Sequence, residues 1–172
     1  MPIPLVMTII GPDRTGLVES LAGCVAENGG NWLESRLCRL GGEFAGILRI
    51  EIPDKNKSTL LAALQKISGL TVTVCADDQN IPSIAGRLTA LEIVGHDRPG
   101  IVHEISAALA RAGVNVEEFS SEVASAPMSG ETLFKAAARL QLPEHCDLAV
   151  LQRDLEKIAS DLLVDVSFKD LR

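Results

Sequence analysis

The strongest constraint on this chain is that its 172 residues contain two copies of one sequence pattern. The turn Gly11–Val18 recurs as Gly95–Val102, 84 positions later, and at the same offset Asn31 matches Asn115. Further matches follow in the same order, at offsets that grow to 90 and 92. A collinear series of this kind predicts a duplicated unit, with a longer hairpin in the second copy.

Each copy has the pattern of strand, helix, strand, strand, helix, strand. In the first copy, the apolar run Leu5–Ile10 predicts a strand, and the apolar spacing over 17–25 predicts a helix. The glycines at 41–42 predict a hairpin, and Ser58 is expected to cap the second helix. In the second copy, that helix is expected from about 147 to 162. The pattern predicts an α+β fold of two ferredoxin-like βαββαβ units, each an antiparallel four-stranded sheet with helices on one face.

A polar segment separates the two copies. Residues 77–87 contain Pro82 and Gly86 and lack a hydrophobic period, which is typical of a linker. We therefore expect one domain over 1–76, a linker over 77–87 and a second domain over 88–172.

Charge and composition exclude several classes of protein. Acidic residues outnumber basic ones by 23 to 16, for a net charge of −7, which disfavours direct binding to nucleic acid. The chain has no apolar run of membrane-spanning length and no basic, then apolar, leader. Its four cysteines lack the spacing of a zinc or redox motif, so we expect reduced thiols and a cytoplasmic protein, without metal or cofactor.

The first strand is apolar on both of its faces. Helices can cover only one face of such a sheet, yet Leu5, Met7 and Ile9 alternate with Val6 and Ile10. The second face therefore needs a cover from the sister copy or from a second chain, unless one set of apolar residues lies only at a strand end. We expect self-association, most simply a homodimer.

These motifs resemble the ACT domain, a regulatory module that binds small molecules. The resemblance rests on the turns Asp13–Gly16 and Asp97–Gly100, on the helix after each, and on the Gly-x-Asn motifs that end at Asn31 and Asn115. Two tandem copies are similar to the glycine cleavage system transcriptional repressor family. The resemblance implies a small-molecule effector, plausibly an amino acid such as glycine, and a transcription-activator protein as the partner that contacts DNA.

The candidate ligand site combines the turn and the Asn of each copy. Asp13 and Asp97 could cap the following helix or shape a ligand site, and Gly16 and Gly100 could serve backbone packing or a ligand carboxylate. Asn31 should lie about 18 Å from the turn of its own copy, from a rise of about 1.5 Å per residue over roughly 12 residues. The ligand should therefore lie where the turn of one domain meets the Asn of another. The expected ligand-binding residues are Asp13, Gly16, Leu17, Asn31, Asp97, Gly100, Ile101 and Asn115.

No motif for catalysis is present. The chain lacks a P-loop, a nucleophile elbow and a dinucleotide-binding glycine motif, and its histidines are scattered. We expect a non-enzymatic regulator that modulates transcription through a protein partner. The alternatives are a regulatory subunit or remnant of an amino-acid or one-carbon enzyme, and a dimerisation module without a ligand.

Overall fold

The computed structural model describes residues 1–77, 86–125 and 130–170. The chain divides into two compact units, 1–81 and 82–172, which are described separately. The first unit contains strands β1 (Pro2–Pro12), β2 (Asn31–Leu40), β3 (Glu43–Pro53) and β4 (Thr71–Ala76), helices α1 (Leu17–Glu27) and α2 (Lys57–Leu64), and the short 3-10 helix η1 (Asp54–Asn56). The second contains β5 (Gly86–His96), β6 (Asn115–Ser125), β7 (Thr132–Pro143) and β8 (Val164–Asp170), with α3 (Ile101–Arg111) and α4 (Leu148–Leu162).

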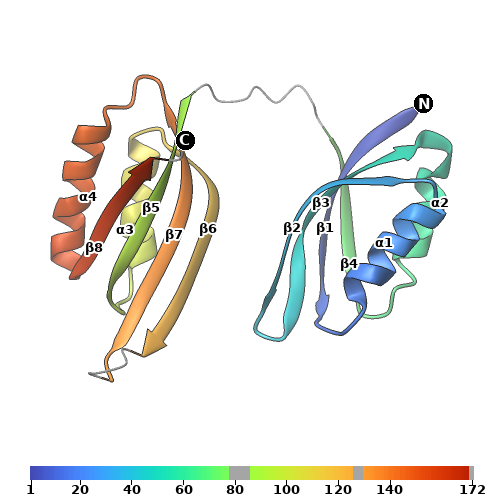
Figure 1. The fold of residues 1–172 in the computed structure, drawn as a ribbon, viewed down its shortest axis with the longest axis horizontal. Helices are drawn as coiled ribbons and strands as arrows, with labels where there is room; N and C mark the ends of the chain where they lie inside the picture. Colours follow the sequence, from blue (N-terminus) through green and yellow to red (C-terminus); the bar gives the residue numbers. More distant parts are fainter. Residues whose placement is uncertain (78–85, 126–129, 171–172) are drawn as a thin grey trace. The chain divides into compact units, whose positions relative to one another are not determined.

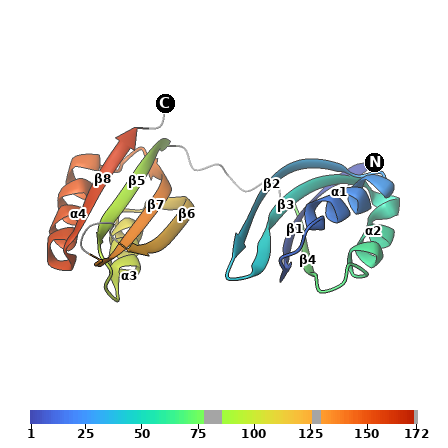
Figure 2. The ribbon, with the colours of Figure 1, turned by 60° about the horizontal axis from the view of Figure 1, so that its bottom comes forward.

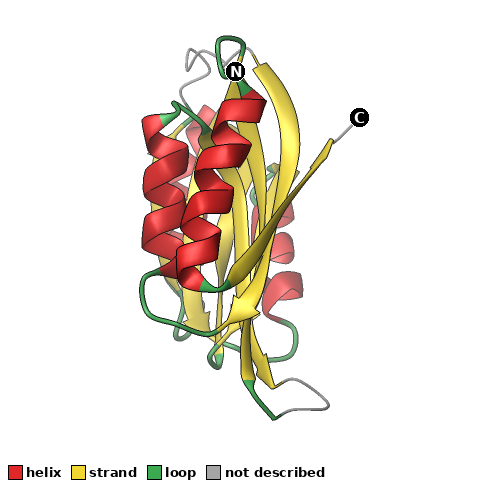
Figure 3. Ribbon diagram, turned by 90° about the vertical axis from the view of Figure 1, so that its left-hand side faces the viewer, coloured by secondary structure: helices red, strands yellow, loops and turns green. Residues whose placement is uncertain are grey.

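Both units have the predicted βαββαβ fold (Figure 1). The strand orders are β2-β3-β1-β4 and β6-β7-β5-β8, and each neighbouring pair is antiparallel. In Figure 2 the first sheet curves around its two helices, and Figure 3 shows the two helices of the second unit on one face of their sheet. The sequence prediction of two ferredoxin-like units is confirmed.

Each unit buries its own hydrophobic core between the sheet and the helices. Along β1 the residues Leu5, Met7 and Ile9 are at most 2% exposed, and they pack with Leu21 and Val25 of α1. Strand alternation places these side chains on one face, and the helical period places α1's apolar stripe against them. The second core is built in the same way from β5, β7, α3 and α4.

The opposite face of the first sheet also carries apolar side chains, and they are exposed within the unit. Ile10 is 49% exposed and Ile47 is 53% exposed, and Thr8, which pairs with Ile47, lies on the same face. Two of the four free cysteines, Cys38 and Cys75, are exposed on this same face, opposite Ala45 and Val6. A cover for this face stays a prediction.

The start of α2 differs from its sequence prediction, whereas the bounds of α4 agree with the expected range. Ser58 does not cap α2, because the chain enters the helix through η1 and Lys57 is already helical. Asp147 does cap α4, where its Oδ1 accepts hydrogen bonds from the amides of Ala149 at 2.9 Å and Val150 at 3.3 Å.

The structure describes only the two ends of the predicted linker over 77–87. Asp77 follows β4, and its carboxylate accepts a hydrogen bond of 2.5 Å from Arg49 Nε. Gly86 and Arg87 already belong to β5, because they pair with Pro143 and Leu142 of β7. Residues 78–85 lie outside the described residues.

Candidate ligand-binding site

The turn after β1 leads directly into α1 through a left-handed glycine. Gly16 is the N-cap residue of α1 with φ 83° and ψ 7°, and its carbonyl accepts the amide of Ser20 at 2.9 Å. A Cβ placed on Gly16 would meet nothing within 4 Å. The glycine is therefore required by its backbone conformation and not by close packing against other backbone.

Asp13 does not cap α1, so the capping alternative is wrong for this residue. No described side chain caps the helix, and the Asp13 carboxylate instead pairs with Arg39 Nε of β2 at 2.7 Å. The backbone amide of Asp13 donates to Gly42 O at 2.9 Å, which ties the turn to the β2–β3 hairpin. Asp13 thus fixes the turn against the hairpin. At the N-terminus of α1, Leu17 N donates to Arg14 O at 3.4 Å, and no described side chain caps the amides that follow.

The second unit repeats the turn with different charges around it. Gly100 caps α3 with φ 98°, again without a side-chain hydrogen bond from the described residues, and Asp97 N donates to Thr132 O at 3.0 Å. Val123 occupies the register position of Arg39, since it pairs with Phe134 as Arg39 pairs with Phe44. The register position from which Arg39 reaches Asp13 is therefore held by an uncharged side chain in the second unit.

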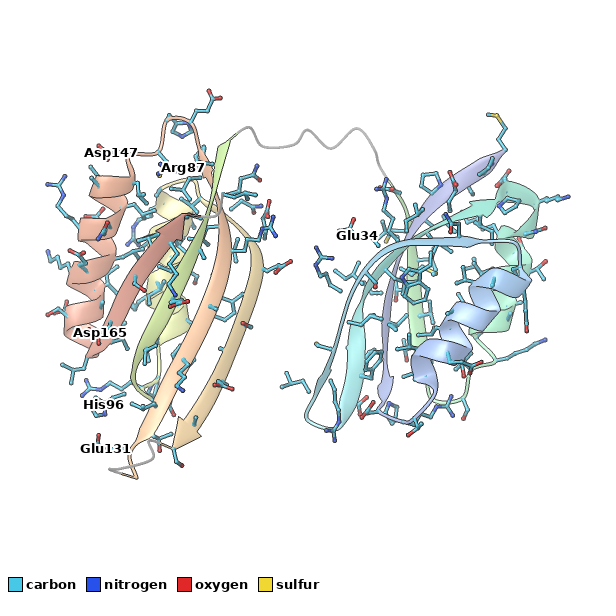
Figure 4. All side chains as sticks on the ribbon, viewed as in Figure 1. Glu34, Arg87, His96, Glu131, Asp147 and Asp165 are labelled. Atoms are coloured by element: carbon cyan, nitrogen blue, oxygen red, sulfur yellow. The ribbon has the colours of Figure 1, made fainter. Side chains whose placement is uncertain are left out.

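A contact between a histidine and a glutamate lies at this end of the second unit. His96 Nδ1 lies 3.9 Å from Glu131 Oε2, and both side chains are about half exposed. Figure 4 shows these two residues at one end of the unit, with Asp147 and Arg87 at the opposite end.

Asn31 and Asn115 lie at the opposite end of their sheets from the turns. Asn31 is the first residue of β2 and pairs with Glu51, whereas the turn follows Pro12, which pairs with Glu43 at the other end of β3. Asn115 likewise opens β6 opposite Gln141. The structure therefore brings Asp13, Gly16 and Leu17 together, and Asp97, Gly100 and Ile101 together, but neither group meets the Asn of its own unit.

The surroundings of the two Asn residues differ between the units. In the first unit, Asn56 Nδ2 donates to Asn28 O at 2.8 Å and closes the loop before β2. In the second unit, Cys146 lines two hollows of about 400 and 450 Å³ near the end of β7 and the start of α4. Burial first, and the Asp147 carboxylate second, raise the pKa of the Cys146 thiol, while Arg87 opposes them.

Arg39 is the residue at the turn that the sequence argument missed. Its proximity to Asp13 depends on the β2–β3 register, and the signal for it in the sequence is the tight hairpin at Gly41 and Gly42. No group of three or more metal-ligating side chains occurs in the described part of the chain. Among the described helices, none is long and apolar enough to cross a membrane.

Comparisons with known proteins agree with this architecture. One model of the ACT domain matches residues 4–74, and a second ACT-domain model matches residues 89–134. No curated protein matches the chain in sequence.

Two solved structures match over the whole chain. A protein of unknown function from Galdieria sulphuraria is 26% identical, with a TM-score of 0.87 and 100% of each chain covered. A proposed glycine cleavage system transcriptional repressor is 20% identical, with a TM-score of 0.70, over 100% of this chain and 99% of that one. At this identity the second match shows the shared fold.

Proposed function

Because the chain belongs to the ACT-domain family and carries two such domains in tandem, we propose that it is a non-enzymatic regulatory protein that binds a small molecule. The observation that carries the proposal is that both domains present an uncapped helix N-terminus behind a left-handed glycine, Gly16 and Gly100. Amides at such an end bind carboxylates well. An amino acid such as glycine is the ligand class we expect.

We place the ligand where the turn of one domain meets the Asn of another domain, in the same chain or in a second copy. The first-turn amides after Gly16 would bind the carboxylate, and Asn31 would orient the ammonium group with its side-chain oxygen. This arrangement is supported by the separation of turn and Asn within each unit. Binding would then be linked to domain pairing, which is how the protein could signal. In the second domain, Gly100 and Asn115 would have the same roles.

The output would be transcriptional control through a cytoplasmic protein partner. The name of the solved repressor that matches the whole chain supports this, and the partner would be a transcription activator. With a net charge of −7, the protein alone should show no appreciable affinity for DNA at physiological salt. A gel-shift assay that detects tight, salt-sensitive binding to a specific duplex would contradict this part of the proposal.

A thermal-shift screen against the twenty amino acids is the first test, followed by titration calorimetry on any hit. Asn31→Ala and Asn115→Ala should each weaken binding if both domains form sites, by about 1–3 kcal/mol for a lost polar anchor. Gly16→Asn tolerates the left-handed backbone but adds a side chain beside the open amides, so it should also weaken binding. Unchanged affinity in these variants and in Gly100→Asn would show that the ligand binds elsewhere.

A further inference from the structure

An apolar pocket lies between α3 and the edge strand β6 of the second unit. Its volume is about 220 Å³. Eight of its nine lining residues are hydrophobic, and the set is Leu91, Ile93, Val102, Ile105, Ser106, Leu109, Val116, Phe119 and Ala138. The Ser106 hydroxyl donates to His103 O at 3.1 Å, so its proton is already used within the helix. The pocket thus offers a ligand apolar contact and no charge.

The first unit carries larger side chains at two of the equivalent positions. The residue just before the bulge in the edge strand is Trp32 in β2 but Val116 in β6. In the neighbouring strand, Leu48 pairs with Met7, whereas its counterpart Ala138 pairs with Leu91. Trp32 packs against the first core, and Leu48 is 1% exposed.

The second unit has therefore exchanged an indole ring and a leucine side chain for two smaller groups, and it has gained a phenyl ring, because Phe119 pairs with Ala138 as Ser35 pairs with Leu48. The pocket is open to solvent, since Val102, Val116 and Phe119 at its rim are 38–45% exposed. An apolar cavity of about 150 Å³ is enough to bind benzene. The space here is somewhat larger, and one of its walls is the aromatic ring of Phe119.

We propose that this pocket binds a small uncharged aromatic molecule of the size of indole. An indole ring would take the place that the Trp32 side chain occupies in the first unit, with its faces against Ile105 and Phe119. The uncharged lining would disfavour a ligand whose ring carries a charge, because burying that charge unpaired is costly. The pocket shares no residue with the turn or with Asn115, so the inference is independent of the proposed amino-acid site.

Titration calorimetry of the full chain with indole tests the proposal. We expect saturable binding of one indole per chain, in the micromolar to millimolar range. Ala138→Leu restores the residue of the first unit and should lower the affinity at least tenfold. Ala137→Leu is the matched control, because the neighbouring residue faces the other side of the sheet, and it should leave the affinity unchanged.

Val116→Trp provides a second variant in case Ala138→Leu does not fold, and it should also abolish binding. Thermal melting of each variant shows whether the fold is intact. The proposal is overturned if the parent does not bind indole, or if folded Ala138→Leu and Val116→Trp bind it as tightly as the parent. A result in which Val116→Trp changes only the sedimentation of the protein would likewise overturn it, and would identify the pocket as a contact with a second copy.

Discussion

At the scale of single residues, the turns that lead into α1 and α3 depend more on backbone conformation than on side-chain chemistry. Eight glycines have positive φ, and Gly16 and Gly100 both use this conformation to end a turn and begin a helix. A left-handed conformation is costly for a residue with a Cβ. The open helix ends therefore exist because glycine stands there.

Gly16→Ala should lower the free energy of unfolding by about 1–2 kcal/mol, the cost of a left-handed alanine. Gly23→Ala is the control, since Gly23 lies inside α1 and its new Cβ would meet nothing within 4 Å. That change should raise stability by up to about 1 kcal/mol. Urea unfolding curves of the two variants measure both effects, and equal shifts would refute the argument from φ.

The thiols of Cys24 and Cys146 should respond to pH differently from a free cysteine. Burial is the main cause that raises both pKa values, with Glu27 adding to it at Cys24 and Asp147 at Cys146. Their alkylation by iodoacetamide, followed by mass spectrometry, should therefore need a higher pH than that of a cysteine peptide. Because the neutral thiol is the favoured form in the fold, stability is complete below the ordinary thiol pKa and declines as pH rises through the raised values. A midpoint at or below that of the peptide would contradict this prediction.

At the scale of elements, the sequence predicted what depends on periodicity and missed what depends on register. The buried residues Leu5, Met7 and Ile9 follow from alternation, and the bounds of α4 lie within one residue of the expected helix over about 147–162. The partner of Asp13 does not, because Arg39 reaches it only through the pairing of β2 with β3. In each unit the sequence predicted two separate sets of candidate ligand residues, the turn and the Asn. No local sequence pattern predicts which turn of one domain lies next to which Asn of another.

The contribution of the Asp147 cap on α4 to the free energy of unfolding can be measured directly. Asp147→Ala removes two hydrogen bonds to first-turn amides and should cost about 1 kcal/mol of unfolding free energy. Ser58→Ala is the contrasting variant, since Ser58 lies inside the first turn of α2 and is not its N-cap. Its effect should stay within about 0.5 kcal/mol. Chemical denaturation of both variants checks the difference, and a larger loss at Ser58 would contradict it.

At the scale of the whole molecule, the outer face of the first sheet carries exposed apolar side chains that a partner could cover. Ile10 and Ile47 expose about half of their surface there, beside Thr8 and the two exposed thiols. Apolar groups gathered on a sheet face are typical of an interface. We expect this face to be covered when the protein associates.

Maleimide labelling of Cys38 and Cys75 reports on that cover. Both thiols lie on the outer face, so they should react slowly at a protein concentration that favours the homodimer and quickly after dilution. Sedimentation gives the oligomeric state under the same conditions. Fast labelling of both cysteines in a preparation that sediments as a dimer would show that the dimer uses another surface.

Lysine substitutions on β1 separate the two faces of the same strand. Met7→Lys places a charge in the core and should unfold the unit, because Met7 is fully buried. Thr8→Lys faces outward and should leave the unit folded while it weakens association. Circular dichroism and sedimentation read the two outcomes, and a folded monomeric parent that accepts Thr8→Lys without any change would refute the covered face.

The two separate hydrophobic cores have a consequence for how the protein is made. The buried residues of the first core all precede Thr71, and Val72 and Val74 of β4 pack against them, so every residue of that core is synthesised before the second unit. No strand of the first sheet awaits a partner from the later sequence. The first unit can therefore fold during translation, before the second unit has been synthesised in full.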